Sequence, residues 1–385
     1  MRKNVSLLQI FVQINVAISY KLVQKNVDMK RNVLSKLIDW KNKKNRKPLI
    51  LNGARQVGKT YILREFGSQC YEKMAYVNCD KNKMLEKIFS QDYNISRILL
   101  SLSAILHVNI EPGNTLIIFD EIQESPTVLN SLKYFCEDAP QYHVAVAGSL
   151  LGISLHNNTS FPVGKVDMIK MYPMTFDEFL MAIGEQPLVD ILATKDFSII
   201  DSLSVRFIDC LRQYYYVGGM PAAVAEFAST KNLEEVRNIQ KQILFDYRRD
   251  FSKHAPSQEV PRINMVWDSI PAQLAKENKK FIFGALKKGA RASEFEIAIQ
   301  WLLDAGLIYQ INRITTPSIP LKFYEEMSVF KLFVLDIGLM GAMSDAPAES
   351  VIVADSLFKE YKGAFTELFV LTQLITNDLP IYYYS

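Results

Sequence analysis

Short apolar runs alternate with helix-like stretches over the first half of the chain. The runs lie at 49–52, 74–79, 115–119 and 143–148. Apolar runs of this length, bounded by turns, are typical of parallel strands that are buried on both faces. Between the runs, apolar residues recur at helical spacing, as at 82–108 and 126–138. The alternation predicts an open parallel α/β sheet with helices on both faces.

The same pattern predicts where this first unit ends. Residues 166–172 form the last expected strand, Pro173 stops it, and Thr175 caps the helix that follows. We therefore expect a first domain at 29–184. Helical spacing then dominates 185–254, which predicts a helical region.

Two further units are expected after the helical region. Helical spacing near 262–275, 281–287 and 292–304 precedes extended pieces near 307–313 and 321–335. Because this order is typical of a winged helix, we expect a winged-helix-like domain at 255–345. A helix at 357–376 and a strand at 381–384 come next. We interpret 346–385 as the incomplete start of another α/β domain.

A glycine-rich loop joins the first strand to the next helix. From Gly53 to Thr60 the chain reads Gly-Ala-Arg-Gln-Val-Gly-Lys-Thr, which is the Walker A pattern of a phosphate-binding loop. Glycines let the backbone approach a phosphate, and successive N–H groups point at the anion. We expect Lys59 to reach the β- and γ-phosphates of ATP, and the Thr60 hydroxyl to bind Mg²⁺.

A second motif closes the strand at 115–119. The strand ends in Asp120 and Glu121, which is a Walker B pattern. We expect Asp120 to hold Mg²⁺ and Glu121 to activate a water, although a strand can also simply end in polar residues. Ser149, just after the strand at 143–148, either senses the γ-phosphate or caps a turn. The residues expected to bind the nucleotide are Gly53, Ala54, Arg55, Gln56, Val57, Gly58, Lys59, Thr60, Tyr61 and Ser149.

Charge is unevenly distributed along the chain. Residues 1–47 contain 12 Lys and Arg against 2 Asp and Glu, whereas 48–385 contain 32 against 39. The mildly acidic body does not support nucleic-acid binding. A stretch with helical spacing begins at Met29, so we interpret Met29 as the natural start and 1–28 as a non-native or disordered extension.

Cysteine usage and hydropathy give an expected location. Cys70, Cys79, Cys136 and Cys210 have no metal-ligand spacing, which favours reduced thiols in a cytoplasmic protein. No run approaches 18 uninterrupted apolar residues, so we expect no membrane span.

Two arginines are candidates for an arginine finger, the residue that meets the γ-phosphate in many ATPases. Arg248 and Arg249 end a helical stretch at 232–250, but an ion pair with Asp246 or Asp250 is the simpler interpretation. The helix expected at 292–304 carries two glutamates, which would repel phosphates. We therefore interpret its domain as a packing or relay module rather than a reader of DNA.

Several stretches together resemble a family of AAA-superfamily ATP-binding proteins of bacteria and archaea. They are MKRNVLSKLIDWKNKKNRKPLILNGARQVGKT (29–60), LIIFDEIQ (116–123), VAVAGSLLG (144–152), YPMTFDEFL (172–180), YYVGGMPAAV (215–224), WLLDAGLIYQI (301–311), FKLFVLDIGLM (330–340) and KGAFTELFVLTQL (362–374). The resemblance implies an additional-strand ATPase core, a winged helix and a C-terminal domain similar to restriction endonucleases.

Two positions bear on what this resemblance implies. The family usually has Gly-Arg where this chain has Gly164 and Lys165, and lysine cannot imitate the arginine fork. Glu367 matches the first acidic position of the nuclease-like domain, whose other acidic residues this chain lacks. The resemblance therefore implies no nuclease activity for the chain as given.

The leading functional hypothesis is an Mg²⁺-dependent ATPase that couples its nucleotide state to the C-terminal domains. The alternatives are a nucleotide-gated switch with little turnover, and the ATPase subunit of a system that acts on nucleic acid. ATP and Mg²⁺ are the expected ligands. A protein partner is expected but not identified, and homo-oligomers stay an open alternative.

Overall fold

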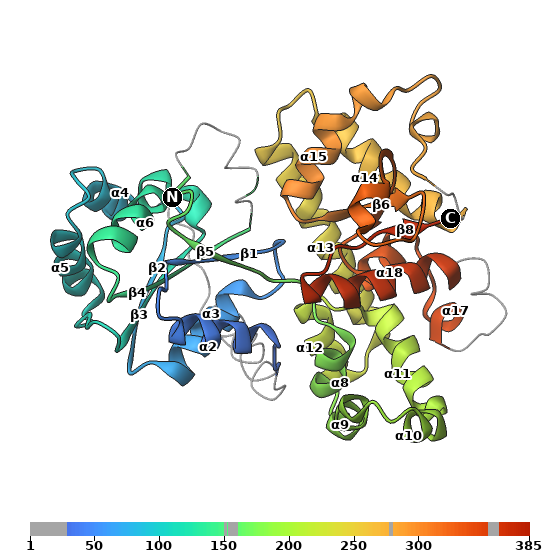
Figure 1. Cartoon of the computed structure of the whole chain (residues 1–385), viewed down its shortest axis with the longest axis horizontal. Coiled ribbons are helices and arrows are strands. Elements are labelled where there is room, and N and C mark those ends of the chain that lie inside the picture. The colour runs from blue at the N-terminus through green and yellow to red at the C-terminus, as the bar shows by residue number, and fades with distance from the viewer. Residues whose placement is uncertain (1–28, 150–151, 153–160, 277–279, 353–361) are drawn as a thin grey trace, which may run out of the picture.

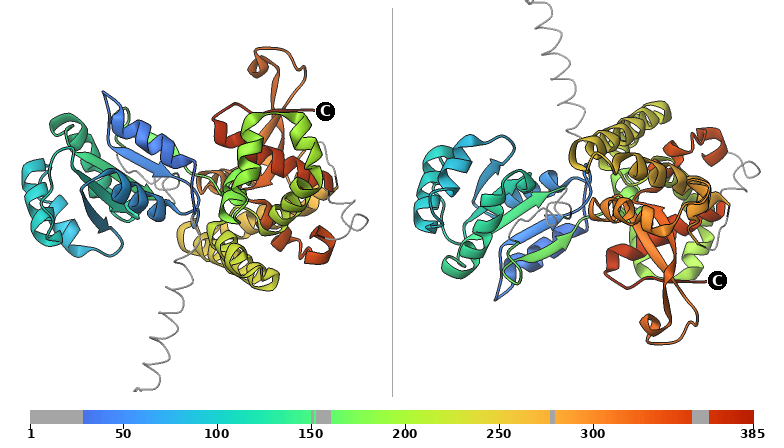
Figure 2. Two further views of the ribbon diagram at one scale, coloured as in Figure 1. Left: turned by 90° about the horizontal axis from the view of Figure 1, so that it is seen from below. Right: turned by 90° about the horizontal axis from the view of Figure 1, so that it is seen from above.

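Two lobes lie side by side in the structure. The computed structural model describes residues 29–149, 152, 161–276, 280–352 and 362–385. One lobe contains a parallel sheet, and the other is mainly helical (Figure 1). Perpendicular views show the same two lobes (Figure 2). The expected extension at 1–28 lies outside the described residues.

The larger sheet confirms the predicted α/β class. Among the described residues it contains β1 (Leu49–Asn52), β2 (Lys73–Asn78), β3 (Thr115–Asp120), β4 (His143–Gly148) and β5 (Asp167–Lys170). All neighbours in the order β2-β3-β4-β1-β5 are parallel. β4 therefore lies between β1 and β3 and is the additional strand that the resemblance implies. Ligands of such sheets bind at the carboxyl ends of the strands.

Helices cover both faces of this sheet. They are α2 (Val33–Asn42), α3 (Lys59–Cys70), α4 (Lys83–Phe89), α5 (Ile95–Leu106) and α6 (Pro126–Asp138). Leu49 and Leu51 share a core with α2 and α3, whereas Ile117 and Phe119 share another with the remaining three helices. Successive side chains of a strand point to opposite faces, so an unbroken apolar run places side chains in both cores.

The stretch with helical spacing at 82–108 forms two helices, α4 and α5. The Asn94 side chain accepts a hydrogen bond from the backbone N–H of Arg97 at 3.0 Å and caps the start of α5. Asparagine at such a cap favours a new helix start over a continued helix.

The second lobe is built from helices and a small sheet. Its helices are α8 (Phe176–Ala182), α9 (Gln186–Thr194), α10 (Phe197–Ser202), α11 (Ser204–Val217), α12 (Pro221–Thr230), α13 (Leu233–His254), α14 (Val260–Ala275), α15 (Glu296–Asp304), α16 (Ile337–Met343), α17 (Ala348–Ile352) and α18 (Lys362–Leu374). In its sheet, β6 (Ile308–Ile314) pairs antiparallel with β7 (Glu325–Val334) and parallel with β8 (Tyr383–Tyr384).

The expected winged-helix-like unit differs from its prediction in one helix. The stretch at 281–287 contains only a 3-10 turn, Phe283–Ala285. The backbone N–H of Phe281 donates to the Phe330 carbonyl of β7 at 2.7 Å, and the two rings stack. Pairing with β7 holds this segment extended. The helix at 260–275 and the two extended pieces agree with the sequence, and the winged-helix assignment itself stays a prediction.

A buried carboxylate joins two of the motifs that carry the family resemblance. Asp336 accepts hydrogen bonds from the backbone N–H of Gly219 at 2.6 Å and of Leu339 at 2.9 Å. Burial raises the pKa of the Asp336 carboxyl to about 6, although several backbone N–H groups favour its charged form. Gly219 has no room for a side chain, since a Cβ would lie 2.1 Å from the Met174 carbonyl oxygen. These residues fix α16 against the end of α11.

The C-terminal segment packs on this lobe. Phe365 and Leu368 of α18 belong to the same core as α11 and α14, and β8 extends the small sheet. Glu367 forms an ion pair with Lys331 at 2.9 Å. The division at 346, the incomplete domain beyond it and the nuclease-like assignment stay predictions.

Candidate nucleotide-binding site

The phosphate loop leaves β1 at a crowded point. A Cβ on Gly53 would lie 2.3 Å from the Met171 carbonyl oxygen, so only glycine fits where the loop passes the end of β5. At the other end of the loop, Gly58 has a φ of 95°. The left-handed backbone at Gly58 precedes α3, whose first N–H groups point back into the loop.

The middle of the loop has a conformation suited to an anion. Gln56 has a φ of 68°, an unusual value for a residue other than glycine, and Gly58 is left-handed as well. Left-handed residues in such a loop turn successive backbone N–H groups towards one point, which forms an anion-binding nest. The positive end of α3 adds to this field. The loop can therefore bind a phosphate group without changing these two backbone angles.

Lys59 lies across the loop. Its Nζ donates hydrogen bonds to the Gly53 carbonyl at 2.9 Å and to the Ala54 carbonyl at 2.8 Å. An ammonium group has three N–H donors, so one more is available for a phosphate oxygen. Burial lowers the pKa of Lys59 to about 8, while the nearby Glu121 and Asp120 carboxylates favour its charged form. An anion in the loop would supply a further partner for this buried cation.

The two expected Mg²⁺ ligands are brought together. Thr60 Oγ1 donates to Asp120 Oδ2 at 2.7 Å, and the Tyr76 hydroxyl donates to the same oxygen at 2.8 Å. Mg²⁺ prefers oxygen ligands and commonly keeps waters and substrate phosphates in its remaining positions. A hydroxyl and a buried carboxylate beside the phosphate loop fit that requirement. The described residues contain no cluster of three or more His, Cys, Asp or Glu for a fully protein-bound ion.

Glu121 follows the strand that ends in Asp120. Its backbone is left-handed, with a φ of 52°, and its Oε2 accepts a hydrogen bond from Gln123 Nε2 at 2.6 Å. Although burial lowers the pKa of Lys59 overall, the Glu121 carboxylate favours the charged form of Lys59 and so raises this pKa. Ser149 is buried directly after β4, between the strands that carry the two motifs. Tyr61 is half-exposed on the first turn of α3.

One basic residue that supports the loop, Arg31, was not predicted from the sequence. Arg31 is buried, and its Nη1 donates to the Val57 carbonyl at 2.9 Å. Its Nη2 donates to the Tyr172 carbonyl at 2.6 Å, and its Nε lies 3.2 Å from Glu178. Residues 1–47 are rich in Lys and Arg, and no local pattern distinguishes Arg31 from the other basic residues of this stretch. Its role depends on segments more than 100 residues away, as the separation of 141 residues from Tyr172 shows.

A second group of missed residues lies on α13. The Tyr247 hydroxyl donates to the Arg55 carbonyl at 2.9 Å, Gln56 Nε2 donates to Asp246, and Arg55 forms an ion pair with Asp250. Asp246 and Asp250 appeared in the sequence only as partners for the arginines beside them. They contact the phosphate loop instead.

None of the finger candidates reaches the loop in this structure. Arg248 forms an ion pair with Asp268 of α14 at 2.5 Å, and the Arg249 guanidinium lies over the Phe245 ring. An ion pair was the simpler expectation for Arg248, but the partner is Asp268 and not a residue of α13. Lys165 pairs with Glu137 at 2.8 Å.

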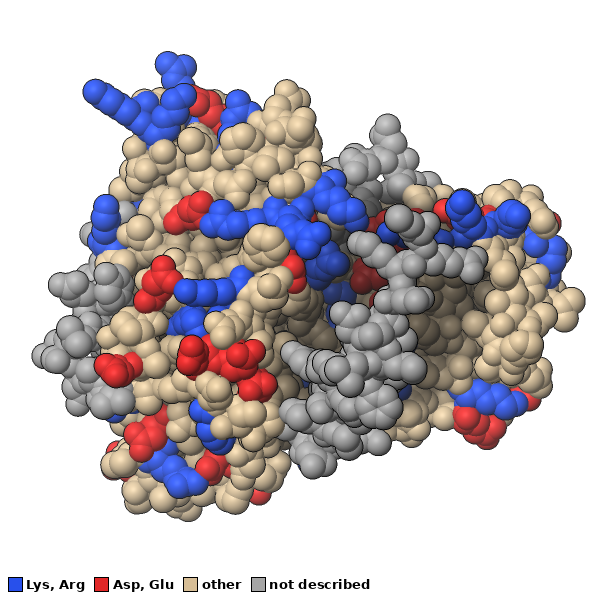
Figure 3. Space-filling model, turned by 180° about the vertical axis from the view of Figure 1, so that it is seen from behind, with Lys and Arg blue, Asp and Glu red and all other residues tan. Residues whose placement is uncertain are grey.

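The surface between the lobes carries positive charge. In a view from behind, Lys and Arg side chains gather beside the hollow between the lobes, whereas both signs are interspersed over much of the same face (Figure 3). Positive side chains beside this hollow would attract an anionic ligand. The mixed charge elsewhere on this face agrees with the balance of the sequence.

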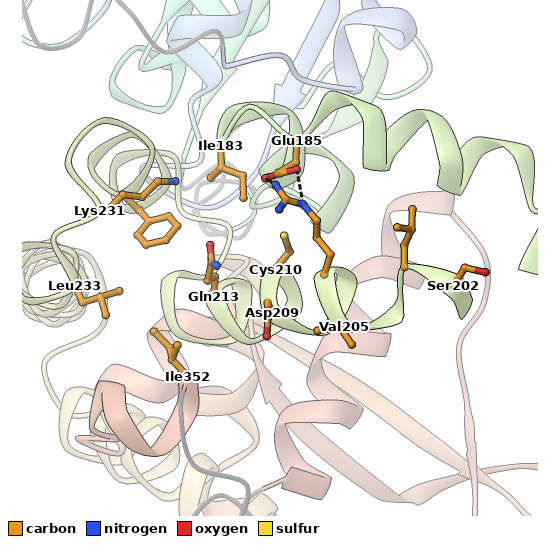
Figure 4. Close-up of a pocket in the computed structure, with 13 residues that line it drawn as sticks. Ile183, Glu185, Ser202, Val205, Asp209, Cys210, Gln213, Lys231, Leu233 and Ile352 are labelled. Carbon is orange, nitrogen blue, oxygen red and sulfur yellow. Dashed lines mark hydrogen bonds and ion pairs between the residues drawn. The ribbon is translucent and has the colours of Figure 1, made fainter. Parts of the chain in front are cut away.

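A separate pocket of about 770 Å³ lies in the helical part of the second lobe (Figure 4). Glu185, Arg206, Cys210 and Lys231 are among its lining residues, and Arg206 Nε donates to Glu185 at 3.3 Å. No residue that lines it belongs to the predicted nucleotide site. Burial raises the pKa of the Cys210 thiol, so this thiol is not activated as a nucleophile.

The cysteines form no disulfide among the described residues. All four thiols are free, and burial raises the pKa of Cys79 to about 12. Among the described residues, no helix has the length and apolar character needed to cross a membrane.

Two family models match the chain. One, described as an AAA domain, matches residues 45–180, and the other, a domain of unknown function (DUF8612), matches residues 208–350. The first match covers β1 to α8 and contains both Walker motifs. No curated protein matches the chain.

Several solved structures are similar to this chain, and one of them has a TM-score above 0.5. The Walker-type ATPase PABY2304 of Pyrococcus abyssi has a TM-score of 0.53 at 14% identity, with 82% of this chain and 96% of that chain covered. The Orc1 protein of Aeropyrum pernix in complex with DNA has a TM-score of 0.31 at 14% identity and coverages of 84% and 96%. The RuvB Holliday junction branch migration motor of Thermotoga maritima has a TM-score of 0.34 at 13% identity and coverages of 77% and 93%.

The TM-score of 0.53 for PABY2304 indicates a common fold, and at 14% identity this likeness shows the fold alone. The AAA domain match covers residues 45–180, and the likeness to PABY2304 agrees with a P-loop fold for this part of the chain. Nucleotide binding is the activity that this fold supports.

Proposed function

We propose that the chain is an Mg²⁺-dependent ATPase. The observation that carries the proposal is the meeting of the two Walker motifs: Thr60 of the phosphate loop donates to Asp120 at the end of β3 at 2.7 Å. A hydroxyl and a carboxylate at this spacing, beside a preformed anion nest, match the requirements of a nucleoside triphosphate with its metal ion. The AAA domain match over residues 45–180 supports the same conclusion.

Each residue of the proposed site has its own role in ATP hydrolysis. The N–H groups of the loop and the Lys59 ammonium bind the β- and γ-phosphates and stabilise the negative charge that shifts during phosphoryl transfer. Thr60 and Asp120 would hold Mg²⁺, which neutralises phosphate charge when it is bound. Glu121 orients a water and accepts its proton as the water attacks the γ-phosphate. Ser149, at the end of β4, donates to the γ-phosphate.

A slow nucleotide-gated switch is the second candidate. It is favoured by the hydrogen bond of 2.6 Å between Gln123 and Glu121, which occupies one oxygen of the expected base. In that state Glu121 is less available to a water, so ATP stays bound longer between turnovers. Both candidates use the same loop and metal ligands, and both couple nucleotide occupancy to the second lobe.

A role in a system that acts on nucleic acid has less support. Outside residues 1–47 the chain is mildly acidic, and Glu294 and Glu296 are exposed at the start of α15. Phosphate backbones bind to Lys and Arg, not to carboxylates. We retain the winged-helix unit as a packing module in this proposal.

Nucleotide binding can be tested directly with a fluorescent ATP analogue. We expect the wild type to bind it more tightly with Mg²⁺ than with EDTA, and we expect Thr60→Ala to lose most of that difference. Ser68→Ala serves as a matched control, because it removes an exposed hydroxyl of the same helix outside the expected nucleotide site. Equal binding by wild type with Mg²⁺ and with EDTA would contradict the metal dependence. No binding at all would contradict the proposed function.

A further inference from the structure

Three residues on one face of α13 contact the middle of the phosphate loop. The Tyr247 hydroxyl donates to the Arg55 carbonyl at 2.9 Å, and Asp246 Oδ2 accepts from Gln56 Nε2 at 3.0 Å. One turn further on, Asp250 Oδ1 lies 2.5 Å from Arg55 Nη1. The contacts reach across 190 to 195 residues of sequence, from the second lobe to the first.

These contacts hold the part of the loop that has the least favourable backbone. Gln56 is left-handed, with a φ of 68°, and this conformation costs a residue other than glycine about 1 kcal/mol or more. The same conformation aims the N–H groups of the nest. A loop that lacked outside support would sample other conformations and would have to recover this one whenever a phosphate bound.

The helix that provides the support is itself well fixed. Tyr247 is buried and packs edge-on against Trp267. Asp246 Oδ1 accepts a second hydrogen bond from Gln242 at 3.0 Å, which orients its carboxylate. Gln240, earlier on α13, donates to the carbonyls of Tyr216 and Val217. The groups that face the loop are therefore held before any nucleotide binds.

We propose that Asp246 and Tyr247 are positioning residues of the nucleotide site, which hold the backbone of Arg55 and Gln56 in the conformation that binds the phosphates. The inference rests on the proposed function and adds the second lobe to that site. Because the hydrogen bonds and the nucleotide favour the same loop conformation, they strengthen each other by thermodynamic linkage. Nucleotide binding thereby tightens the contact between the lobes.

The carboxylates on α13 also have an opposite effect on nucleotide binding. A carboxylate near bound phosphates repels them, so removing Asp246 for this reason alone would tighten nucleotide binding. Both Asp246 oxygens already accept hydrogen bonds, and Asp250 is neutralised by Arg55. We therefore expect the loss of loop support to outweigh the relief of repulsion.

The test compares affinity with turnover in four variants of the full chain. Tyr247→Phe removes one hydroxyl and keeps the buried ring, and Asp246→Ala removes the acceptor for Gln56. Asp246→Asn keeps one acceptor oxygen without the charge. Asp268→Ala, which breaks the Arg248 pair, is the control on the other side of α13.

Affinity for the fluorescent ATP analogue and phosphate release at saturating ATP are measured for each variant. We expect Tyr247→Phe to raise Kd and KM about fivefold, the size of one neutral hydrogen bond, with kcat nearly unchanged. Asp246→Ala should raise both about tenfold, because the lost hydrogen bond has a charged acceptor. Asp246→Asn and Asp268→Ala should bind as the wild type does. A merely structural role would lower the amount of folded protein without this division between KM and kcat.

Other outcomes overturn the proposal in distinguishable ways. Tighter binding by both Asp246 variants would show that repulsion, not support of the loop, is the main effect of this carboxylate. Wild-type affinity in Tyr247→Phe and Asp246→Ala would exclude positioning by α13 and leave nucleotide binding intact. If the wild type bound no nucleotide, the proposed function would fail and this inference would fail with it.

Discussion

Thr60 Oγ1 and Asp120 Oδ2 lie 2.7 Å apart, although 60 residues separate them in the sequence. Thr60 lies in the first turn of α3, after the loop that follows β1, whereas Asp120 ends β3. The strands β1 and β3 are not neighbours, because β4 lies between them. The parallel order of the sheet brings both ends to one edge. This contact joins the two Walker motifs into one site.

Lys59→Met should weaken ATP binding by about 10- to 100-fold, because a charge-assisted hydrogen bond to a phosphate is lost. Methionine keeps much of the length of the buried side chain, so the fold should persist. Titration with the fluorescent ATP analogue measures the change. Lys87→Met, on the exposed face of α4, is the matched control and should bind normally. Equal affinities for the two variants would contradict the role given to Lys59.

Asp120→Asn should raise the Mg²⁺ concentration that half-maximal ATPase activity requires. The neutral amide binds a divalent cation more weakly than a carboxylate does. Binding of ATP in EDTA should change far less, since the loop amides and Lys59 remain. A magnesium titration of phosphate release at fixed ATP checks this prediction. An unchanged magnesium requirement would remove Asp120 from the metal site.

Acid should destabilise the first lobe through His143. Burial, followed by the nearby Arg46 and Lys41 charges, lowers the pKa of His143 to about 4. The unfolded chain therefore binds a proton between pH 6.5 and about 4 that the folded protein does not, and stability falls as the pH falls through this window. The expected loss is about 1 kcal/mol between pH 7 and pH 5.5.

His143→Gln should remove this contribution while it keeps a polar partner for the Tyr71 hydroxyl, which lies 2.7 Å from His143 Nδ1. Urea unfolding at several pH values gives the free energy of unfolding for both proteins. As the pH falls, the free energy of unfolding of the wild type should fall relative to that of the variant. A difference that is independent of pH would show that His143 does not titrate in this way.

Gly219→Ala should prevent stable folding of the second lobe. The new Cβ would lie 2.1 Å from the Met174 carbonyl oxygen, a distance that requires the backbone to move and disturbs the hydrogen bond to Asp336. Gly284→Ala is the matched control, because no atom lies within 4 Å of its Cβ position. Thermal unfolding should show a large loss for the first variant and almost none for the second. Equal stability would contradict the close packing of α11 against α16.

Local pattern was sufficient for the sheet and for the two Walker motifs. Apolar runs recover β1, β3 and β4 almost to the residue, because a buried parallel strand needs unbroken apolar sequence. The loop from Gly53 to Thr60 could be identified because its glycines are needed for the backbone path, its lysine for the phosphates and its threonine for Mg²⁺. The pattern did not foresee the break at Asn94, since one capping side chain decides it.

Contacts across long separations could not be predicted in the same way. Arg31 and Tyr247 support the phosphate loop from segments that show ordinary helical or basic patterns in the sequence. Asp336 follows the apolar end of β7 in the sequence, yet its side chain binds Gly219, which lies 117 residues away. Only the packing of the lobes reveals these partners.

The central claim is that this site hydrolyses ATP with Glu121 as the base. The most direct test measures phosphate release with Mg²⁺ for the wild type and for Glu121→Gln, with binding of the ATP analogue measured in parallel. We predict that Glu121→Gln binds ATP as tightly as the wild type but releases phosphate about 100-fold more slowly. Equal rates in the two proteins, or a near-zero rate in the wild type while ATP still binds, would contradict the account.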